Sequence, residues 1–238
     1  MSAILRDQTV LVVGRGGGIA RAVTLAVRDA GARVVVAGRD RDALDAAYDD
    51  PDISAETVDL TDEPSVASLA ERLGQVDHVV STASARARGR VADLTQEPLL
   101  RSLNTKVIGP IMLAKHFAAR MPQHGSFVLF SGSSALKPAV GALGVAITNG
   151  AVDVLTRSLA VELAPIRVNA ISPGTIDTGA WDGLGDEKKQ EMFADRVARN
   201  PARRIGIAQD IGEAVLFALT NTFMTGVSLP IDGGEPLV

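Results

Sequence analysis

A cluster of glycines follows the first apolar segment of the chain and could hold a phosphate group. Residues 9–13 are typical of a strand buried on both faces, and apolar residues at helical spacing begin at Ile19. Between them stand Gly14, Arg15, Gly16, Gly17 and Gly18. Backbone N–H groups at a helix N-terminus can bind a pyrophosphate, and glycines let its oxygens come close. A tight turn without a ligand is the alternative, but this place between a strand and a helix favours a dinucleotide site.

Two arginines indicate which dinucleotide would bind. Arg39 ends the second apolar segment, where a dinucleotide fold usually reads the adenosine ribose. An acidic residue there would accept a hydrogen bond from the 2′-hydroxyl, whereas a guanidinium favours a 2′-phosphate, with which Arg15 could also pair. We therefore predict NADP(H) rather than NAD(H) as the cofactor, with two solvated surface arginines as the alternative.

Composition excludes several other chemistries. The 238 residues include no cysteine and three histidines, so thiolate catalysis, iron–sulfur clusters and structural zinc have no ligand set, and we expect no metal. A net charge of -4 argues against a nucleic-acid partner. No apolar run reaches the length of a membrane span, and charge comes too early for a signal peptide, so we expect no membrane partner and a cytoplasmic location.

Apolar and amphipathic segments alternate along the whole chain. Strand-like segments cover residues 9–13, 33–37, 55–58, 76–81, 126–131, 167–171 and 227–231, and helical segments cover 19–30, 98–120, 142–164, 186–199 and 209–220, with shorter ones after Asp40 and Thr61. This alternation predicts an α/β fold: a Rossmann-type doubly wound parallel sheet of about seven strands with helices on both faces. Residues 1–238 are expected to form a single domain, in which 172–205 is a substrate loop or lid.

The ordered motifs resemble those of the short-chain dehydrogenase/reductase (SDR) family along nearly the whole chain. The glycine loop is similar to the family's TGxxxGxG, and Asp59-Leu60 resembles the acidic dipeptide that lies by the adenine. Asn104 matches the family's helix asparagine, residues 166–174 with Thr178 match I-R-V-N-x-x-x-P-G-x-x-x-T, and residues 231–234 match the closing strand. The resemblance implies an NADP(H)-binding oxidoreductase with cofactor contacts from the glycine loop, Ile19, Arg39, Asp59, Leu60, Ala83, Asn149, Pro173, Gly174, Ile176 and Thr178.

The tyrosine and lysine of the family's catalytic helix are missing. Their positions fall on Val145 and Asn149, and the chain's one tyrosine, Tyr48, lies far upstream. Val145 has no proton to give. Asn149 could bind a ribose hydroxyl, but as a neutral group it could not lower a neighbour's pKa as an ammonium does.

The family's catalytic serine is also displaced. Strict spacing puts Gly132 at its position, with Ser131 and Ser133 on either side. Candidate catalytic residues are therefore Asn104, Ser131 and Ser133. An unactivated hydroxyl is a poor acid at neutral pH, so ordinary alcohol dehydrogenation by the usual route is not expected.

Three functions remain open. The first is an atypical NADP(H)-dependent oxidoreductase with a non-standard proton donor, which acts on a small molecule. The second is a catalytically inactive nucleotide-binding protein or partner subunit, and the third is a non-redox enzyme that reuses the cleft. Arg86, Arg88 and Arg90 follow the fourth strand and could bind an anionic substrate or form a solvated loop. The resemblance further implies a homo-tetramer or homo-dimer that packs through helices 98–120 and 142–164.

Overall fold

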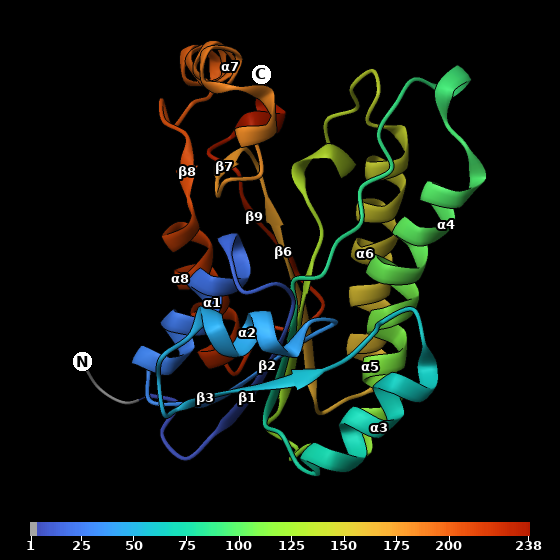
Figure 1. The fold of residues 1–238 in the computed structure, drawn as a ribbon, viewed down its shortest axis with the longest axis vertical. Coiled ribbons are helices and arrows are strands. Elements are labelled where there is room, and N and C mark those ends of the chain that lie inside the picture. The colour runs from blue at the N-terminus through green and yellow to red at the C-terminus, as the bar shows by residue number, and fades with distance from the viewer. Residues whose placement is uncertain (1–3) are drawn as a thin grey trace.

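The computed structural model describes residues 4–238 and confirms the predicted fold (Figure 1). Seven parallel strands form one sheet in the order β3-β2-β1-β4-β5-β6-β9. They are β1 (Thr9–Val13), β2 (Arg33–Gly38), β3 (Ile53–Thr57), β4 (His78–Ser81), β5 (Ser126–Phe130), β6 (Arg167–Pro173) and β9 (Ser228–Ile231). The order reverses beside β1, which is the switch point where open α/β sheets bind ligands.

The α-helices are α1 (Gly18–Asp29), α2 (Arg41–Ala47), α3 (Glu63–Leu73), α4 (Gln96–Leu103), α5 (Gly109–Phe117), α6 (Leu143–Glu162), α7 (Asp186–Arg199) and α8 (Ala208–Thr220). Short turns are η1 (Val91–Asp93), η2 (Asn104–Ile108), η3 (Ala118–Arg120), η4 (Ser133–Ala135), η5 (Asp182–Leu184) and η6 (Glu235–Leu237). Two helices begin at an aspartate, because Asp40 accepts from the Ala43 N–H (3.0 Å) and Asp62 accepts from the Ser65 N–H (3.2 Å).

Helices cover the sheet on both faces, as Figure 1 shows. One core lies between the sheet and α3, α5 and α6, and its largest side chains include Phe117 and Phe127. The other lies between the sheet and α1 and α8, with Val23, Val27 and Ile211 at its centre. Burial on both faces explains why the strands are continuous apolar runs rather than alternating ones.

The backbone is helical throughout residues 98–120, where one long helix is predicted, but it is not a regular α-helix over that whole length. Between α4 and α5 the backbone widens into η2, a π-helical turn. Gly109 follows it at a close approach to the third-strand loop, where a Cβ would lie 2.8 Å from the Leu60 Cβ. A π-turn adds a residue to the helical repeat and re-aims the side chains around it.

Residues 172–205 contain more structure than a loop. Ser172 and Pro173 complete β6, and the rest forms β7 (Ile176–Asp177), η5 and α7, after which β8 (Gly206–Ile207) pairs with β7. Helix α7 lies beyond the end of β6 and has no fully buried residue (Figure 1). Lys189 joins it to Asp177 (2.9 Å) and Asp182 (2.7 Å). A lid function for this segment stays a prediction.

None of the helices within residues 4–238 is long and apolar enough to cross a membrane. The same residues bring no three histidine, aspartate or glutamate side chains together in a way that could hold a metal ion.

Arg167 is expected to stabilise the fold by binding the end of α8. Its buried guanidinium donates to the carbonyls of Ala218 (2.9 Å), Leu219 (2.6 Å) and Met224 (3.3 Å). Arg167→Met leaves these carbonyls unpaired, and we expect a loss of about 3 kcal/mol in the free energy of unfolding. Urea titration checks this, with Arg6→Met on the exposed surface as the control. Equal midpoints for the two variants would contradict the role.

His78 is expected to make the fold sensitive to acid. Its ring nitrogens lie 2.8 Å from Ser126 Oγ and 2.8 Å from Gln8 Oε1, and burial is the main cause that lowers the pKa of His78 to about 4. The unfolded chain takes up this proton near pH 6.5, so stability is lost as the pH falls from about 6.5 to about 4, by about 3 kcal/mol. In His78→Gln the pH dependence of urea unfolding in this window should be flatter than in the unchanged protein. Parallel curves would reject this assignment.

Candidate active site

The glycine segment lies at the carboxyl end of β1 and is pressed against its neighbours. The Gly14 N–H donates to the Ala37 carbonyl (2.9 Å), a Cβ at position 14 would overlap Thr82 Oγ1, and one at Gly38 would lie 2.6 Å from the Gly14 oxygen. Helix α1 starts at Gly17 with no side-chain cap and no acidic residue in its first turn. Its first N–H groups are therefore open to an anion.

The segment after β6 lies against the same loop. Gly18 has a φ of +57°, and a Cβ there would lie 3.2 Å from the Thr178 oxygen. The structure therefore brings Thr178 next to Gly14–Gly18, as a shared cofactor site requires. Glycine at positions 14 and 18 allows this close packing against Thr82 and Thr178, and the uncapped N–H groups at the start of α1 form a backbone cradle that could hold a pyrophosphate.

Other predicted cofactor residues lie at or beyond the carboxyl ends of β4 and β6. Pro173 and Gly174 end β6, and a Cβ at Gly174 would lie 2.7 Å from the Asp232 Cα. The Ile176 side chain is buried in the core beside α1 and α8, while its carbonyl accepts from Trp181 Nε1 (3.0 Å). Ala83, past the end of β4, packs against the core on the opposite face.

The adenosine end of the predicted site carries opposite charges. Arg39 is exposed at the end of β2, and Asp59 is partly buried after β3, next to buried Leu60. Two hydrogen bonds from Thr61 lower the pKa of Asp59, and the charge of Arg39 lowers it further, so the two side chains are near one another. An exposed arginine here is open to a phosphate, while Asp59 is held in place by Thr61 (2.8 Å from the N–H and 2.7 Å from Oγ1).

Gly132 and Asn149, which the sequence analysis assigned to the family's serine and lysine positions, are in contact. Asn149 is 3% exposed, and its Nδ2 donates to Ser134 Oγ (2.7 Å) and to the Gly132 carbonyl (3.4 Å). A Cβ at Gly132 would lie 2.7 Å from Asn149 Nδ2, so the glycine makes room for the amide. Ser131 is buried, and its hydroxyl donates to the Asn149 carbonyl (3.0 Å).

The structure separates the three predicted catalytic residues. Ser131 lies against Asn149, and Ser133 begins the turn η4 with a partly buried side chain. Asn104 ends α4 and lines a different hollow of about 350 Å³, together with Thr61, Gln96, Glu97, Leu100 and Arg101. Asn104 thus lines this hollow, whereas Ser131 contacts Asn149 directly.

Lys106 is the functional candidate that sequence reasoning missed. Its ammonium donates to the Ser131 carbonyl (3.0 Å) and to Asn149 Oδ1, and the side chain is 8% exposed. Burial is the main cause that lowers the pKa of Lys106 to about 8; the charge of Arg86 lowers it further, and Asp153 opposes the shift. The available signal was that Lys106 is the one charged residue between Ser102 and Ala114. A lone lysine in an apolar helix has to find a buried partner.

More positive charge surrounds this group. Partial burial lowers the pKa of Arg86, as do the nearby charges of Arg88 and Arg15, so the loop after β4 and the glycine loop place their arginines close together. The Arg88 guanidinium lies over the Trp181 ring, 5.7 Å from its centroid, and thereby joins this loop to the segment after β7. This arrangement suits an anionic ligand.

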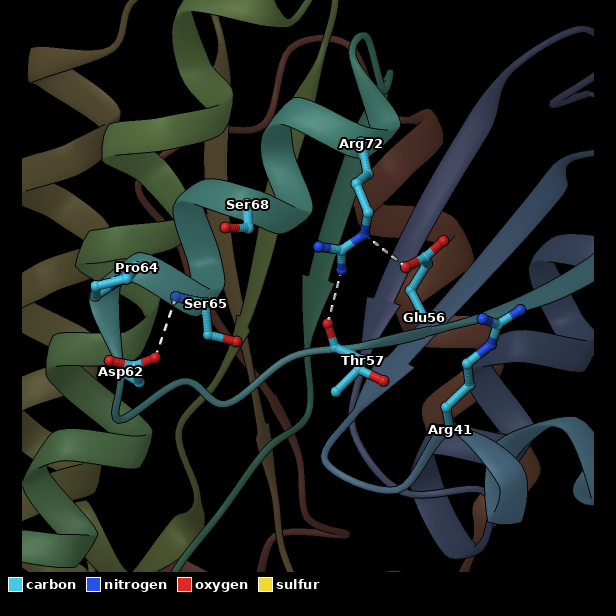
Figure 2. A pocket seen from close by; sticks show the side chains of 8 residues that line it. All are labelled: Arg41, Glu56, Thr57, Asp62, Pro64, Ser65, Ser68 and Arg72. Carbon is cyan, nitrogen blue, oxygen red and sulfur yellow. Dashed lines mark hydrogen bonds and ion pairs between the residues drawn. The ribbon is translucent and has the colours of Figure 1, made fainter.

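A larger hollow of about 480 Å³ has a separate set of lining residues, which Figure 2 shows. It lies at the β3 edge of the sheet, between α2 and α3. Its polar side chains are largely occupied with each other: Arg72 binds Glu56 (3.0 Å) and the Thr57 carbonyl (3.0 Å), and Asp62 caps α3. We assign it no part in the reaction.

The chain is similar to known proteins over nearly its whole length. A family model described as enoyl-(acyl carrier protein) reductase matches residues 13–235. The chain is 32% identical to short-chain dehydrogenase/reductase ucsE of Acremonium sp, over 97% of this chain and 96% of that protein. It is 30% identical to the L-xylulose reductase of Mus musculus, over 97% of each chain.

Solved structures agree in fold and in length. A small-chain dehydrogenase in complex with NADPH has a TM-score of 0.83 and 32% identity, with 97% of this chain and 99% of that chain covered. The MalC reductase/Diels-Alderase of Malbranchea aurantiaca has a TM-score of 0.90 and 30% identity over 99% of both chains. By its motifs, its fold and these relatives, the chain belongs to the short-chain dehydrogenase/reductase family.

Proposed function

We propose that this protein is an NADP(H)-dependent oxidoreductase that reduces a carbonyl group, with a proton donor other than the family's tyrosine. The observation that carries the proposal is the intact backbone cradle at the start of α1, with Arg39 exposed at the end of the neighbouring strand. A related structure that holds NADPH supports the same cofactor. NADPH supplies hydride when bound.

The chain's own residues define what the rest of the site does. Gly14–Gly18 and the first turn of α1 bind the pyrophosphate, Arg39 and Arg15 bind the 2′-phosphate, and Asn149 faces the nicotinamide ribose. Arg86 and Arg88 orient an anionic substrate. Val145 contributes an apolar wall, so the proton has to come from another side chain.

A non-redox cyclisation is the second candidate. The MalC relative is named both a reductase and a Diels-Alderase, so a chain of this family can carry out a reaction that transfers no hydride. A site that has lost its tyrosine fits such a reaction, and a product formed without NADPH oxidation would indicate it. An inactive partner subunit has no comparable observation in its favour.

A homo-dimer or homo-tetramer in the cytoplasm is part of the proposal. Helix α6 exposes an apolar stripe at seven-residue spacing, with Ile147 53%, Val154 55% and Val161 81% exposed. Helix α4 exposes Leu100 (48%) beside it in the fold. Apolar stripes on adjacent helices are suited to packing against a second copy.

Arg39→Ala tests the cofactor assignment. We expect NADPH binding to weaken by about 10- to 100-fold, because a charge-assisted bond to the 2′-phosphate is lost, while NADH binding stays unchanged. Isothermal calorimetry with each nucleotide measures this. Arg33→Ala, at the opposite end of the same strand, is the control. If neither nucleotide binds to the unchanged protein, the proposed function fails.

Val154→Glu tests the oligomer. A carboxylate in the middle of the α6 stripe should dissociate the assembly to monomers, since burying an unpaired charge at an interface is costly. Sedimentation velocity gives the size, and Ile4→Glu, at an exposed position away from the stripe, serves as the control. A monomeric unchanged protein would reject the interface.

A further inference from the structure

Lys106 occupies the place where the altered site lacks a cation. Its ammonium lies between the carbonyl of Ser131, next to the family's serine position, and Oδ1 of Asn149, at the family's lysine position. The amino group therefore reaches the same part of the site from α4–α5 that a lysine at 149 would reach from α6.

The π-turn accounts for this approach. Residues Asn104–Ile108 form the widened turn, and Lys106 is its central residue. The turn packs against α6, while Asn104 faces the hollow on the other side. Even in a regular α-helix, the side chains of residues i and i+2, such as Asn104 and Lys106, point in different directions. The residue that the π-turn inserts rotates Lys106 further relative to α5.

The charges around Lys106 suit proton transfer. Two charged groups act on the Lys106 ammonium: Arg86, from the loop after β4, and Asp153, one turn after Asn149 on α6. Burial and the charge of Arg86 lower the pKa of Lys106 to about 8, and the charge of Asp153 opposes this shift. An amine with this pKa is mostly protonated at pH 7 and is a far better acid than a hydroxyl.

Two of the neighbouring hydroxyls already donate their protons to backbone carbonyls. Ser131 Oγ donates to the Asn149 carbonyl (3.0 Å), and Thr148 Oγ1 donates to the Gly144 carbonyl (3.0 Å). Ser134 Oγ accepts from Asn149 Nδ2 (2.7 Å). An ammonium has three N–H groups, and the bonds to Ser131 and Asn149 use two of them, which leaves a third to donate.

We propose that Lys106 is the proton donor of the reaction, in place of the missing tyrosine. The substrate's carbonyl oxygen takes a proton from the Lys106 ammonium as the carbonyl carbon receives hydride from the reduced nicotinamide. One N–H bond breaks with its electron pair left on nitrogen, the C=O π pair becomes part of the new O–H bond, and the neutral amine later takes a proton from water. The inference rests on the proposed function.

The first test measures the lysine itself and needs no substrate. The chain has five lysines, so protein labelled with ¹³C-lysine gives a small set of signals whose pH titration can be followed by NMR. We expect one lysine to titrate near pH 8, to be absent from Lys106→Met, and to shift when NADPH is added. A Lys106 signal that shows no titration near pH 8 overturns the proposal.

The second test separates proton donation from charge. NADPH oxidation is followed by absorbance with a panel of aliphatic and aromatic ketones and diketones. Lys106→Met and Lys106→Arg should both lose about 10²-fold or more in turnover, because arginine keeps the charge but cannot release its proton. Lys115→Met, an exposed lysine on α5, is the control. Circular dichroism and NADPH titration of each variant verify that it is folded and binds the cofactor.

The pH profile adds a readout that a structural role would not move. In the unchanged protein turnover should fall above about pH 8, where Lys106 loses its proton. Asn149→Asp puts a carboxylate against the ammonium, which should raise the pKa of Lys106. Both the pH at which turnover falls and the NMR titration midpoint of Lys106 should then move up by about one to three pH units.

The outcomes distinguish the inference from the proposed function. If the unchanged protein binds and oxidises NADPH while Lys106→Arg keeps its turnover and its alkaline limb, the inference is wrong and the oxidoreductase remains. If the unchanged protein neither binds nor oxidises NADPH, the proposed function is wrong and proton donation by Lys106 falls with it.

Discussion

A buried ammonium has to replace its lost water with oxygen atoms of the protein, and this requirement organises the site. Lys106 obtains two such oxygens, from the Ser131 carbonyl and from Asn149. Because the Asn149 oxygen is turned toward the ammonium, its NH₂ group has to find acceptors on the opposite side, which are Ser134 Oγ and the Gly132 carbonyl. One cation thereby ties together the π-turn, the end of β5, the turn η4 and the middle of α6.

The same site is positive although the protein is negative overall. The chain carries a net charge of -4. Even so, the charges of Arg88 and Arg15 lower the pKa of Arg86, and the charge of Arg86 lowers the pKa of Lys106, so these four cations are close together. A local positive field of this kind draws anions toward the site from solution and excludes cations, with an effect that decreases as salt is added. Among residues 4–238, Arg86 lowers the pKa of Lys106 and the Asp153 carboxylate opposes that effect.

The fold could be predicted from the sequence because its signals are local and repeated. Each signal fixes the secondary structure of the residues around it: the apolar segments such as residues 9–13, the helix-capping Asp40 and Asp62, and the glycines after β1. The alternation of strand and helix then leaves few possible topologies. The contact of Asn149 with Gly132 could not be found this way, because the two residues meet only once β5 and α6 are packed. Lys106 was missed for a related reason. Its direction depends on a π-turn that no periodicity indicates, and Asn104, which sequence reasoning favoured, was left facing another hollow.

The tight fit of Gly132 against Asn149 has an evolutionary consequence. A side chain at 132 cannot be added while the Asn149 amide occupies its present place, because the two atoms would be 2.7 Å apart. A lysine at 149 beside Lys106 would put two ammonium groups into one buried space. A side chain at 132 and a lysine at 149 are therefore each unfavourable as single replacements while Asn149 and Lys106 keep their present places.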